Sequence, residues 1–237
     1  PFTHNEEYKS QNVTAVYPAE TAGAPQIILC ANYDNLHSEI GNMMSNGGAG
    51  AMQNGTGVAI LLVLAETLQQ QQVKLPFDVR FVFFGASEVG LIGSNVYLTK
   101  QMSGAEKART VLAVNFRRIG GDYTYLYADE VKTDHGALLL DTAKSSGLAI
   151  KAQPKSTPFM PAQYVDTLPY VNWGMLGDQS RLLSVGLHTV SLYGGNLETL
   201  SLSDIDGKAG SITYTSKDTI DGLEQYYPAY GMRMAEA

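Results

Sequence analysis

Strand-like and helical patterns alternate along this chain, and this alternation constrains the fold more than any other feature. Runs rich in Val, Ile, Tyr and Phe predict strands at residues 12–17, 26–31, 78–85, 110–116, 123–128 and 188–193. Helical patterns lie between them, at about 54–72, at 134–146 and at 218–236, the last with a kink at Pro228. We therefore predict a three-layer α/β/α domain with a central mixed, mostly parallel sheet.

The length of 237 residues, with 44% hydrophobic and 16% charged residues, suits one globular domain with a sizeable core. We expect a single domain over residues 1–237. The chain begins at PFTHNEEYKS without a Met or a signal peptide, so we expect it to be a fragment of a longer protein. The region 151–181 contains four prolines and predicts long loops, which in such folds often form the rim of a pocket.

Charge and cysteine content exclude several classes of protein. A net charge of -7 and scattered Lys and Arg residues argue against nucleic-acid binding. The longest apolar stretch, 58–68, is interrupted and too short to cross a bilayer, so we expect a buried helix and no membrane span. Cys30 is the only cysteine, which rules out a disulfide framework and a cysteine metal cluster and predicts a buried core residue.

The segment FVFFGASEVGLIGS, residues 81–94, is an apolar strand that runs into a turn at Glu88 and then into a helix start marked by glycines. It is one of six blocks that occur in the same order as in metallopeptidase family 28. The other blocks are NVTAVYP, QIILCANYDN, GAMQNGTGVAILLVLAETL, VLAVNFRRIGG and TYTSKDTID. Together they cover residues 12 to about 225, and the chain resembles that family. The resemblance implies a zinc-aminopeptidase-like fold, without the helical segment that usually precedes the first strand.

The resemblance also implies an active site with two zinc ions, which are held by imidazole and carboxylate ligands, and a glutamate that activates a bridging water. At most of the matching positions this chain has different residues. Asn32 stands for a ligand His, Gln53 for the bridging Asp, Ser87 for the general base, Arg117 for a ligand Asp and Tyr214 for the last His. The ligand Glu88 and the orienting Asp34 are retained.

These replacements lead to the prediction that the chain is a catalytically inactive homologue of a zinc aminopeptidase, with no metal and no cofactor. A neutral amide does not bridge two dications as a carboxylate does, and an arginine at a ligand position repels metal. Its role would be that of a binding or structural domain, as in the ectodomain of transferrin receptor, which belongs to the same family. The alternative is a metal-dependent aminopeptidase or related hydrolase with an altered metal site.

Arg117 has two possible roles in this reading. Its guanidinium could replace the metal by pairing with Glu88 and Asp34, or it could turn to solvent and leave Glu88 hydrated. His37 lies in the loop after Asn32 and is a further, weaker candidate for a metal ligand.

The partner would be an unknown protein or peptide ligand. Because bacterial members that resemble this chain are usually exported or attached to the surface, we expect an extracellular or cell-surface location. The residue content is compatible with a bacterial exported protein.

Overall fold

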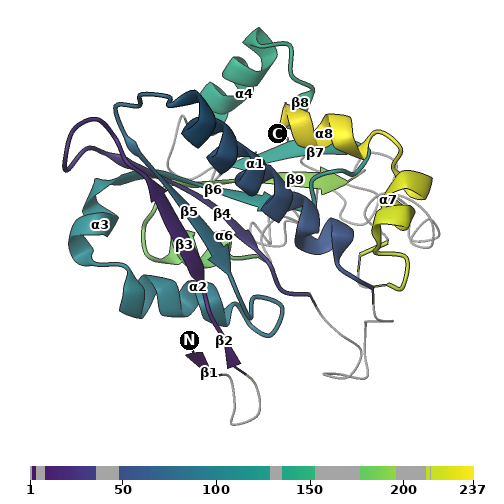
Figure 1. The fold of residues 1–237 in the computed structure, drawn as a ribbon, viewed down its shortest axis with the longest axis horizontal. Coiled ribbons are helices and arrows are strands. Elements are labelled where there is room, and N and C mark those ends of the chain that lie inside the picture. Colours follow the sequence, from purple (N-terminus) through teal and green to yellow (C-terminus); the bar gives the residue numbers. More distant parts are fainter. Residues whose placement is uncertain are drawn as a thin grey trace, which may run out of the picture.

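A seven-stranded mixed sheet forms the centre of the computed structural model, which describes residues 2–3, 9–35, 48–128, 135–152, 177–195, 212–213 and 215–237. The strand order is β3-β5-β4-β6-β9-β7-β8 (Figure 1). The strands are β3 (Val13–Tyr17), β4 (Gln26–Asn32), β5 (Asp78–Phe84), β6 (Thr110–Arg117), β7 (Tyr123–Ala128), β8 (Ile150–Ala152) and β9 (Thr189–Gly195). A separate pair, β1 (Phe2–Thr3) and β2 (Lys9–Ser10), is antiparallel.

Four neighbouring strands, β5, β4, β6 and β9, run parallel to one another, whereas β3 and β7 pair with this group in the antiparallel sense. Parallel strands end at the same edge of a sheet, so the carboxyl ends of β4, β5 and β6 meet there. In α/β sheets that edge is where ligands usually bind.

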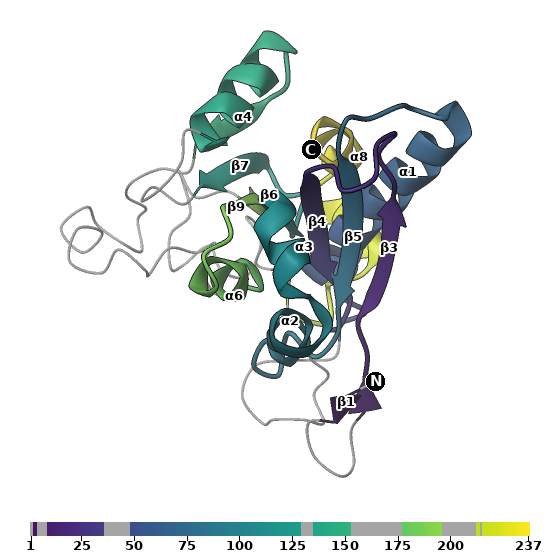
Figure 2. The ribbon, with the colours of Figure 1, turned by 90° about the vertical axis from the view of Figure 1, so that its left-hand side faces the viewer.

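Helices cover both faces of the sheet (Figure 2). On one side lie α1 (Thr56–Gln71) and α8 (Tyr230–Glu236), and on the other α2 (Ile92–Val96), α3 (Gly104–Arg109) and α6 (Gln179–Ser184). The remaining helical elements are η1 (Ala51–Gly55), η2 (Tyr97–Gln101), α4 (His135–Ser145) and α7 (Ile220–Tyr226). The predicted three-layer α/β/α architecture is confirmed.

Each face of the sheet has its own apolar core. Phe81 and Phe116 pack with α1 on one side, and Ile28, Cys30 and Phe84 pack with η2 and α6 on the other. Alternation along β4 and β5 produces this division, because successive side chains point to opposite faces. Cys30 is completely buried, as predicted.

The helical stretch Ala51–Gln71 is long and apolar enough, by length and composition alone, to span a membrane. In the fold α1 contacts β3, β4, β5 and β6, and Leu61 is completely buried against the sheet. One face of α1 therefore contributes to the core of the domain, while Leu62 and Val63 on the same helix are exposed.

The predicted strands agree with the observed ones to within one or two residues at each end. The predicted C-terminal helix is divided into α7 and α8, with Pro228 between them. The prediction of loops over 151–181 is wrong at 151–152, which belong to β8, and at 179–181, which belong to α6. Residues 177–178 lie outside helices and strands, and residues 153–176 lie outside the described residues.

Candidate functional site

Six of the eight residues singled out from the sequence lie at the edge of the sheet where β4, β5 and β6 end. Asn32 and Arg117 are the last residues of β4 and β6, and Ser87 and Glu88 follow the end of β5. Gln53 comes from η1, and Asp34 follows β4. Tyr214 and His37 lie outside the described residues.

Glu88 is held by hydrogen bonds from neutral amides. Its Oε1 accepts hydrogen bonds from Gln53 Nε2 at 2.6 Å and from Asn32 Nδ2 at 3.4 Å. Its backbone N–H donates to Asp34 Oδ2 at 2.9 Å. At the positions where the family resemblance implies metal ligands, Asn32 and Gln53 thus present amide N–H groups to the retained carboxylate.

Asn54 ties η1 to the end of β6 and so fixes the position of Gln53. Its Nδ2 donates to the carbonyl oxygen of Phe116 at 2.7 Å, and its Oδ1 accepts from the backbone N–H of Arg118 at 2.9 Å. Gly57 permits this close approach, because a Cβ there would lie 2.8 Å from the Phe116 oxygen. The peptide bond between Gln53 and Asn54 is cis.

Asp178, at the start of α6, belongs to the site although the sequence analysis missed it. Ser87 Oγ lies 2.8 Å from its Oδ2 and 3.0 Å from its Oδ1, so the serine hydroxyl donates to this carboxylate. Asp178 is 2% exposed. Burial raises its pKa to about 6, although hydrogen bonds from Ser94 and Ser87 act to lower it. Asp178 lies inside the region 151–181 that was predicted as loops, and no motif in the sequence marks it.

Two more carboxyl groups near this edge have raised pKa values. Burial, together with the charge of Glu88, raises the pKa of Asp34, and hydrogen bonds from backbone N–H groups oppose the rise. Burial also raises the pKa of Asp218, whose Oδ1 accepts a hydrogen bond from Met52 N–H at 2.6 Å. Carboxyl groups with raised pKa values at one place are typical of functional sites.

Arg117 does not take either of the roles that the sequence suggested. No ion pair joins it to Glu88, and with 7% of its surface exposed it does not turn to solvent. Its Nη1 is buried and has no hydrogen-bond partner within the described ranges. The hypothesis of an ion pair between Arg117 and Glu88 is therefore wrong, and Glu88 Oε1 accepts from the amides of Gln53 and Asn32.

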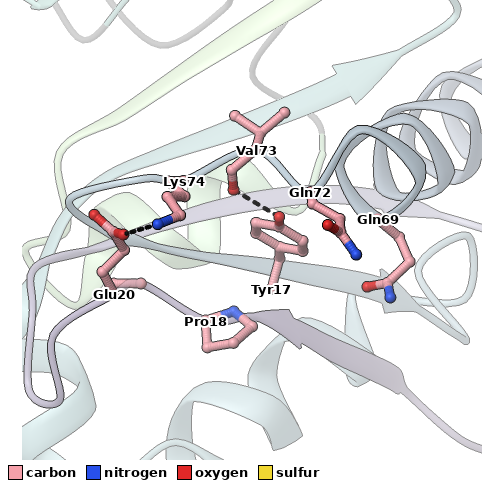
Figure 3. A pocket seen from close by; sticks show the side chains of 8 residues that line it. Tyr17, Pro18, Glu20, Gln69, Gln72, Val73 and Lys74 are labelled. Atoms are coloured by element: carbon pink, nitrogen blue, oxygen red, sulfur yellow. Dashed lines mark hydrogen bonds and ion pairs between the residues drawn. The ribbon is translucent and has the colours of Figure 1, made fainter.

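A separate hollow of about 300 Å³ lies at the opposite edge of the sheet (Figure 3). It is lined by Tyr17, which donates to the Val73 carbonyl oxygen, and by the ion pair of Lys74 with Glu20. Tyr17 pairs with Val79, near the beginning of β5, so this hollow is remote from the strand ends that carry the candidate site.

The sequence model of Peptidase family M28 matches residues 12–224. Aminopeptidase YwaD of Bacillus subtilis is 30% identical over 112 residues, which are 47% of this chain and 22% of that protein. Leupeptin-inactivating enzyme 1 of Streptomyces exfoliatus is 34% identical over 109 residues, which are 46% of this chain and 22% of that enzyme. The chain thus aligns with less than a quarter of the length of each of these relatives.

Solved structures share the fold. The zinc aminopeptidase BSAP of Bacillus subtilis superposes with a TM-score of 0.66 at 18% identity, over 95% of this chain and 48% of its own. A glutaminyl cyclase from an Acidobacteriales bacterium gives a TM-score of 0.65 at 16% identity, over 95% of this chain and 69% of its own. The predicted zinc-aminopeptidase-like fold is therefore confirmed.

These comparisons overturn two predictions, that the chain is not an enzyme and that it uses no cofactor. The matched family is one of peptidases, both sequence relatives are named as enzymes, and zinc aminopeptidases among the structural neighbours point to zinc. The predictions equated the loss of motif residues with the loss of activity. They also took no account of Asp178, which adds a buried carboxyl group beside Ser87.

The donor set of the described residues does not fit a pair of zinc ions. Zinc takes imidazole, thiolate and carboxylate ligands, and no group of three or more such side chains stands close enough together in the described ranges to hold a metal. The carboxyl groups at the site are engaged by N–H and O–H donors instead, as at Asp34, Glu88 and Asp178. Among the described residues, the side chains at the positions of the implied zinc ligands thus differ from the ligand set that the family resemblance implies.

Proposed function

Because this chain belongs to peptidase family M28, we propose that it is the hydrolase domain of an aminopeptidase or related enzyme with an altered metal site. Its substrates would be peptides, cleaved near the amino terminus. The observation that supports this most is the gathering of Asp34, Ser87, Glu88 and Asp178 at the carboxyl ends of the parallel strands. That edge is the usual place for catalytic side chains in α/β folds.

In this proposal the pair of Ser87 and Asp178 moves the proton. Hydrolysis of an amide adds water to the carbonyl carbon and transfers one proton from that water to the departing amine. With a pKa of about 6, Asp178 is mostly ionised at neutral pH and can accept this proton through the Ser87 hydroxyl, then return it to the amine. A carboxyl group with an ordinary pKa would be a weaker base.

The amides around Glu88 keep its carboxylate in place during such a reaction. Gln53 and Asn32 both donate to Oε1, and Asn54 fixes the segment that carries Gln53. Groups held rigidly in this way lose little conformational freedom when a substrate binds.

An assay with a panel of aminoacyl-7-amido-4-methylcoumarin substrates tests the proposal, using the purified chain with and without added zinc. We expect measurable release of the fluorophore, and a fall of about a hundredfold or more in Asp178→Asn. Elemental mass spectrometry of the zinc-incubated, desalted protein should give fewer than two zinc ions per chain.

Asp221→Asn is the matched control, because Asp221 is exposed in the first turn of α7. Its rate should equal that of the wild type. Hydrolysis no faster than in buffer for every substrate would contradict the proposal, as would a rate that Asp178→Asn leaves unchanged. Two zinc ions per chain would contradict the altered metal site.

The location and partners of the protein remain proposals as well. We propose an extracellular or cell-surface location and a peptide or protein as the molecule bound. Since the chain covers about half of the zinc aminopeptidase structure it superposes on, the activity of the whole protein is part of the same proposal.

A further inference from the structure

Asp178 meets Ser87 from the start of a helix that is too short to be stable alone. It directly precedes α6, which has 6 residues, and its side chain makes no capping hydrogen bond to that helix. Isolated helices of this length do not persist in water, so α6 depends on its contacts with the rest of the fold. It lies against α2, β6 and β9 (Figure 2). The position of the Asp178 carboxylate therefore depends on what fixes the start of α6 to the sheet.

Gln179, the first residue of α6, makes the hydrogen bond that fixes this start. Its side chain is 1% exposed, and its Oε1 accepts from Asn115 Nδ2 at 2.9 Å. Its Nε2 has no partner within the described ranges, so the oxygen carries the directional contact of this amide. Further along the helix, Leu182 is completely buried with Ile28 and Cys30. Apolar burial is non-directional, whereas a hydrogen bond sets both distance and orientation.

Asn115 is a fixed anchor for this bond because it lies within the sheet. It belongs to β6, and its Nδ2 also donates to Ser191 Oγ on β9 at 3.4 Å. Its Oδ1 accepts a weak hydrogen bond from Cys30 Sγ on β4 at 3.6 Å. These contacts with both neighbouring strands determine which way the amide points. The bond to Gln179 thus ties the start of α6 to the centre of the sheet.

Gly177 leaves the room that the Gln179 oxygen needs. A Cβ built on this glycine would overlap Gln179 Oε1 and would lie 3.2 Å from Arg117 Nη1. The Gln179 amide therefore folds back over the residue that precedes Asp178. A side chain at position 177 would displace an atom of the bond to Asn115, so the residues on both sides of Asp178 take part in its placement.

We propose that Gln179 is a positioning residue, which anchors the start of α6 to Asn115 and so holds the Asp178 carboxylate against the Ser87 hydroxyl. Its effect on catalysis rests on the function proposed above, in which Ser87 and Asp178 move the proton. The contact between these two side chains exists without a substrate. It can therefore be measured separately from hydrolysis.

Nuclear magnetic resonance titration of protein labelled with carbon-13 at the aspartate carboxyl groups tests the contact itself. The signal that is absent in Asp178→Asn identifies Asp178, and in the wild type it should titrate at about pH 6. Gln179→Met removes the acceptor and keeps the length of the side chain. Displacement of Asp178 from Ser87 removes a donor to the ionised carboxyl group, so in this variant the signal should titrate at about pH 7.

The surroundings of Asp178 make this titration a measure of position. Burial is the largest influence on the pKa of Asp178 and raises it. Hydrogen bonds weaken steeply when their geometry is disturbed, whereas charges act over longer distances. The groups that act on Asp178 are Ser94 and Ser87, whose hydrogen bonds lower its pKa, Asp34, whose charge raises it, Arg117, whose charge lowers it, and the buried thiol of Cys30.

In the hydrolysis assay, Gln179→Met should lower kcat by about tenfold or more and leave KM within about twofold of the wild type. A displaced proton-transfer group slows the chemical step while the surfaces that bind the substrate remain. The limb of the kcat/KM profile that follows ionisation of Asp178 should move to higher pH together with the titration. A loss of folded protein alone would lower the rate without moving this limb.

Gly177→Ala is a second test, because it changes neither Asp178 nor Gln179 but places a methyl group against Gln179 Oε1. It should change the titration and kcat in the same directions. Gln71→Met is the control, with the same substitution at an exposed residue at the end of α1, and should match the wild type. Circular dichroism melts define the temperatures at which all variants are folded, and the comparisons are made there.

An Asp178 signal that titrates at the same pH in the wild type, Gln179→Met and Gly177→Ala would overturn the proposal, whatever the rates. Hydrolysis with an unchanged kcat in Gln179→Met would overturn its role in the reaction. A wild type that hydrolyses no substrate, with a changed titration in both variants, would remove the proposed function and still support Gln179 as the residue that positions Asp178.

Discussion

Arginine side chains are paired with carboxylates at one edge of the sheet and are incompletely paired at the opposite edge. At the edge where β5 begins, Arg109 pairs with Asp78, and Arg80 pairs with Glu106. At the edge where β6 ends, Arg117 has a buried nitrogen without a partner among the described residues. Both edges contain arginine and carboxylate, so the difference lies in how the groups are arranged.

The paired edge forms one closed network. Gln26 Oε1 accepts from Arg80 Nε at 2.9 Å and from Arg109 Nη2 at 3.1 Å, so that each arginine has more than one acceptor. Burial acts to raise the pKa of Asp78, but hydrogen bonds from Ala19 N–H and Arg109 outweigh it and the pKa is lowered. The pKa of Glu106 is lowered as well, mainly by the Ser103 backbone N–H.

At the functional edge the balance is reversed, and burial raises the pKa values of Asp34 and Asp178. A carboxylate with a lowered pKa contributes to the stability of the fold at neutral pH, whereas one with a raised pKa reduces it. One edge is therefore arranged for stability, and the other keeps polar groups whose interactions are incomplete among the described residues. Such incompleteness is expected where a ligand binds.

The largest effect is expected for Asp178→Asn. Because the folded pKa is raised from 3.8 to about 6, this group contributes stability that is fully present below about pH 4 and is lost as the pH rises through 6. The change in pKa corresponds to about 3 kcal/mol. Between pH 4 and pH 8, the stability of the variant relative to the wild type should therefore rise by about that amount in urea denaturation.

The exposed Asp221→Asn serves as the control and should show no such pH dependence. A stability difference for Asp178→Asn that is the same at pH 4 and pH 8 would mean that burial does not raise the pKa of Asp178. The contrast between the two edges would then lose its main electrostatic support.

The second effect concerns the paired edge. Arg109→Met removes the partner of Asp78 together with hydrogen bonds to Ala24 and Gln26, and should lower the free energy of unfolding at pH 7 by about 2 kcal/mol. This figure is below that of a fully buried pair, because the Arg109 side chain is 26% exposed. The loss should diminish as the pH falls through the lowered pKa of Asp78. Arg181→Met, on an exposed arginine, should lose less than a quarter as much.

A smaller effect is expected for Ser87→Ala, which removes the hydroxyl that donates to Asp178. At pH 8 the variant should lose about 1 kcal/mol, since the hydrogen bond stabilises the ionised carboxyl group. At pH 4 the loss should be smaller, because Asp178 is then protonated. Thermal melts at the two pH values measure this difference, and a larger loss at pH 4 would show that the serine serves packing instead.

Most of the fold could be predicted from the sequence because its signals are local. The apolar runs of β4, β5 and β6 identify strands, and the long periodic stretch before Gln72 identifies α1. The short helix α6 was missed, because six residues in a region rich in prolines give no periodic signal. The predicted strand ends agree with the observed ones because the strands end at polar residues such as Asn32 and Arg117.

The site could be predicted only in part. Six ordered blocks located Asp34, Gln53, Ser87, Glu88 and Arg117 at one edge of the sheet, since each follows or ends an element that the sequence identifies. Asp178 was missed because it meets Ser87 across 91 residues and no motif marks it. The partner of Arg117 was predicted wrongly, because which donor reaches the Glu88 oxygen depends on side-chain directions that the sequence does not contain.

The smallest effect, and the sharpest contrast with Arg109, is expected for Arg117→Met. Replacing a buried, incompletely paired charge with an apolar side chain of similar length removes a desolvation penalty and breaks no ion pair with Glu88. The stability at pH 7 should stay within about 1 kcal/mol of the wild type and should not fall as in Arg109→Met. Urea denaturation of both variants under the same conditions makes the comparison. A loss of several kcal/mol in Arg117→Met would show that the guanidinium already has a strong partner within the chain. The arginines at both edges would then be paired, and the contrast between the edges would be wrong.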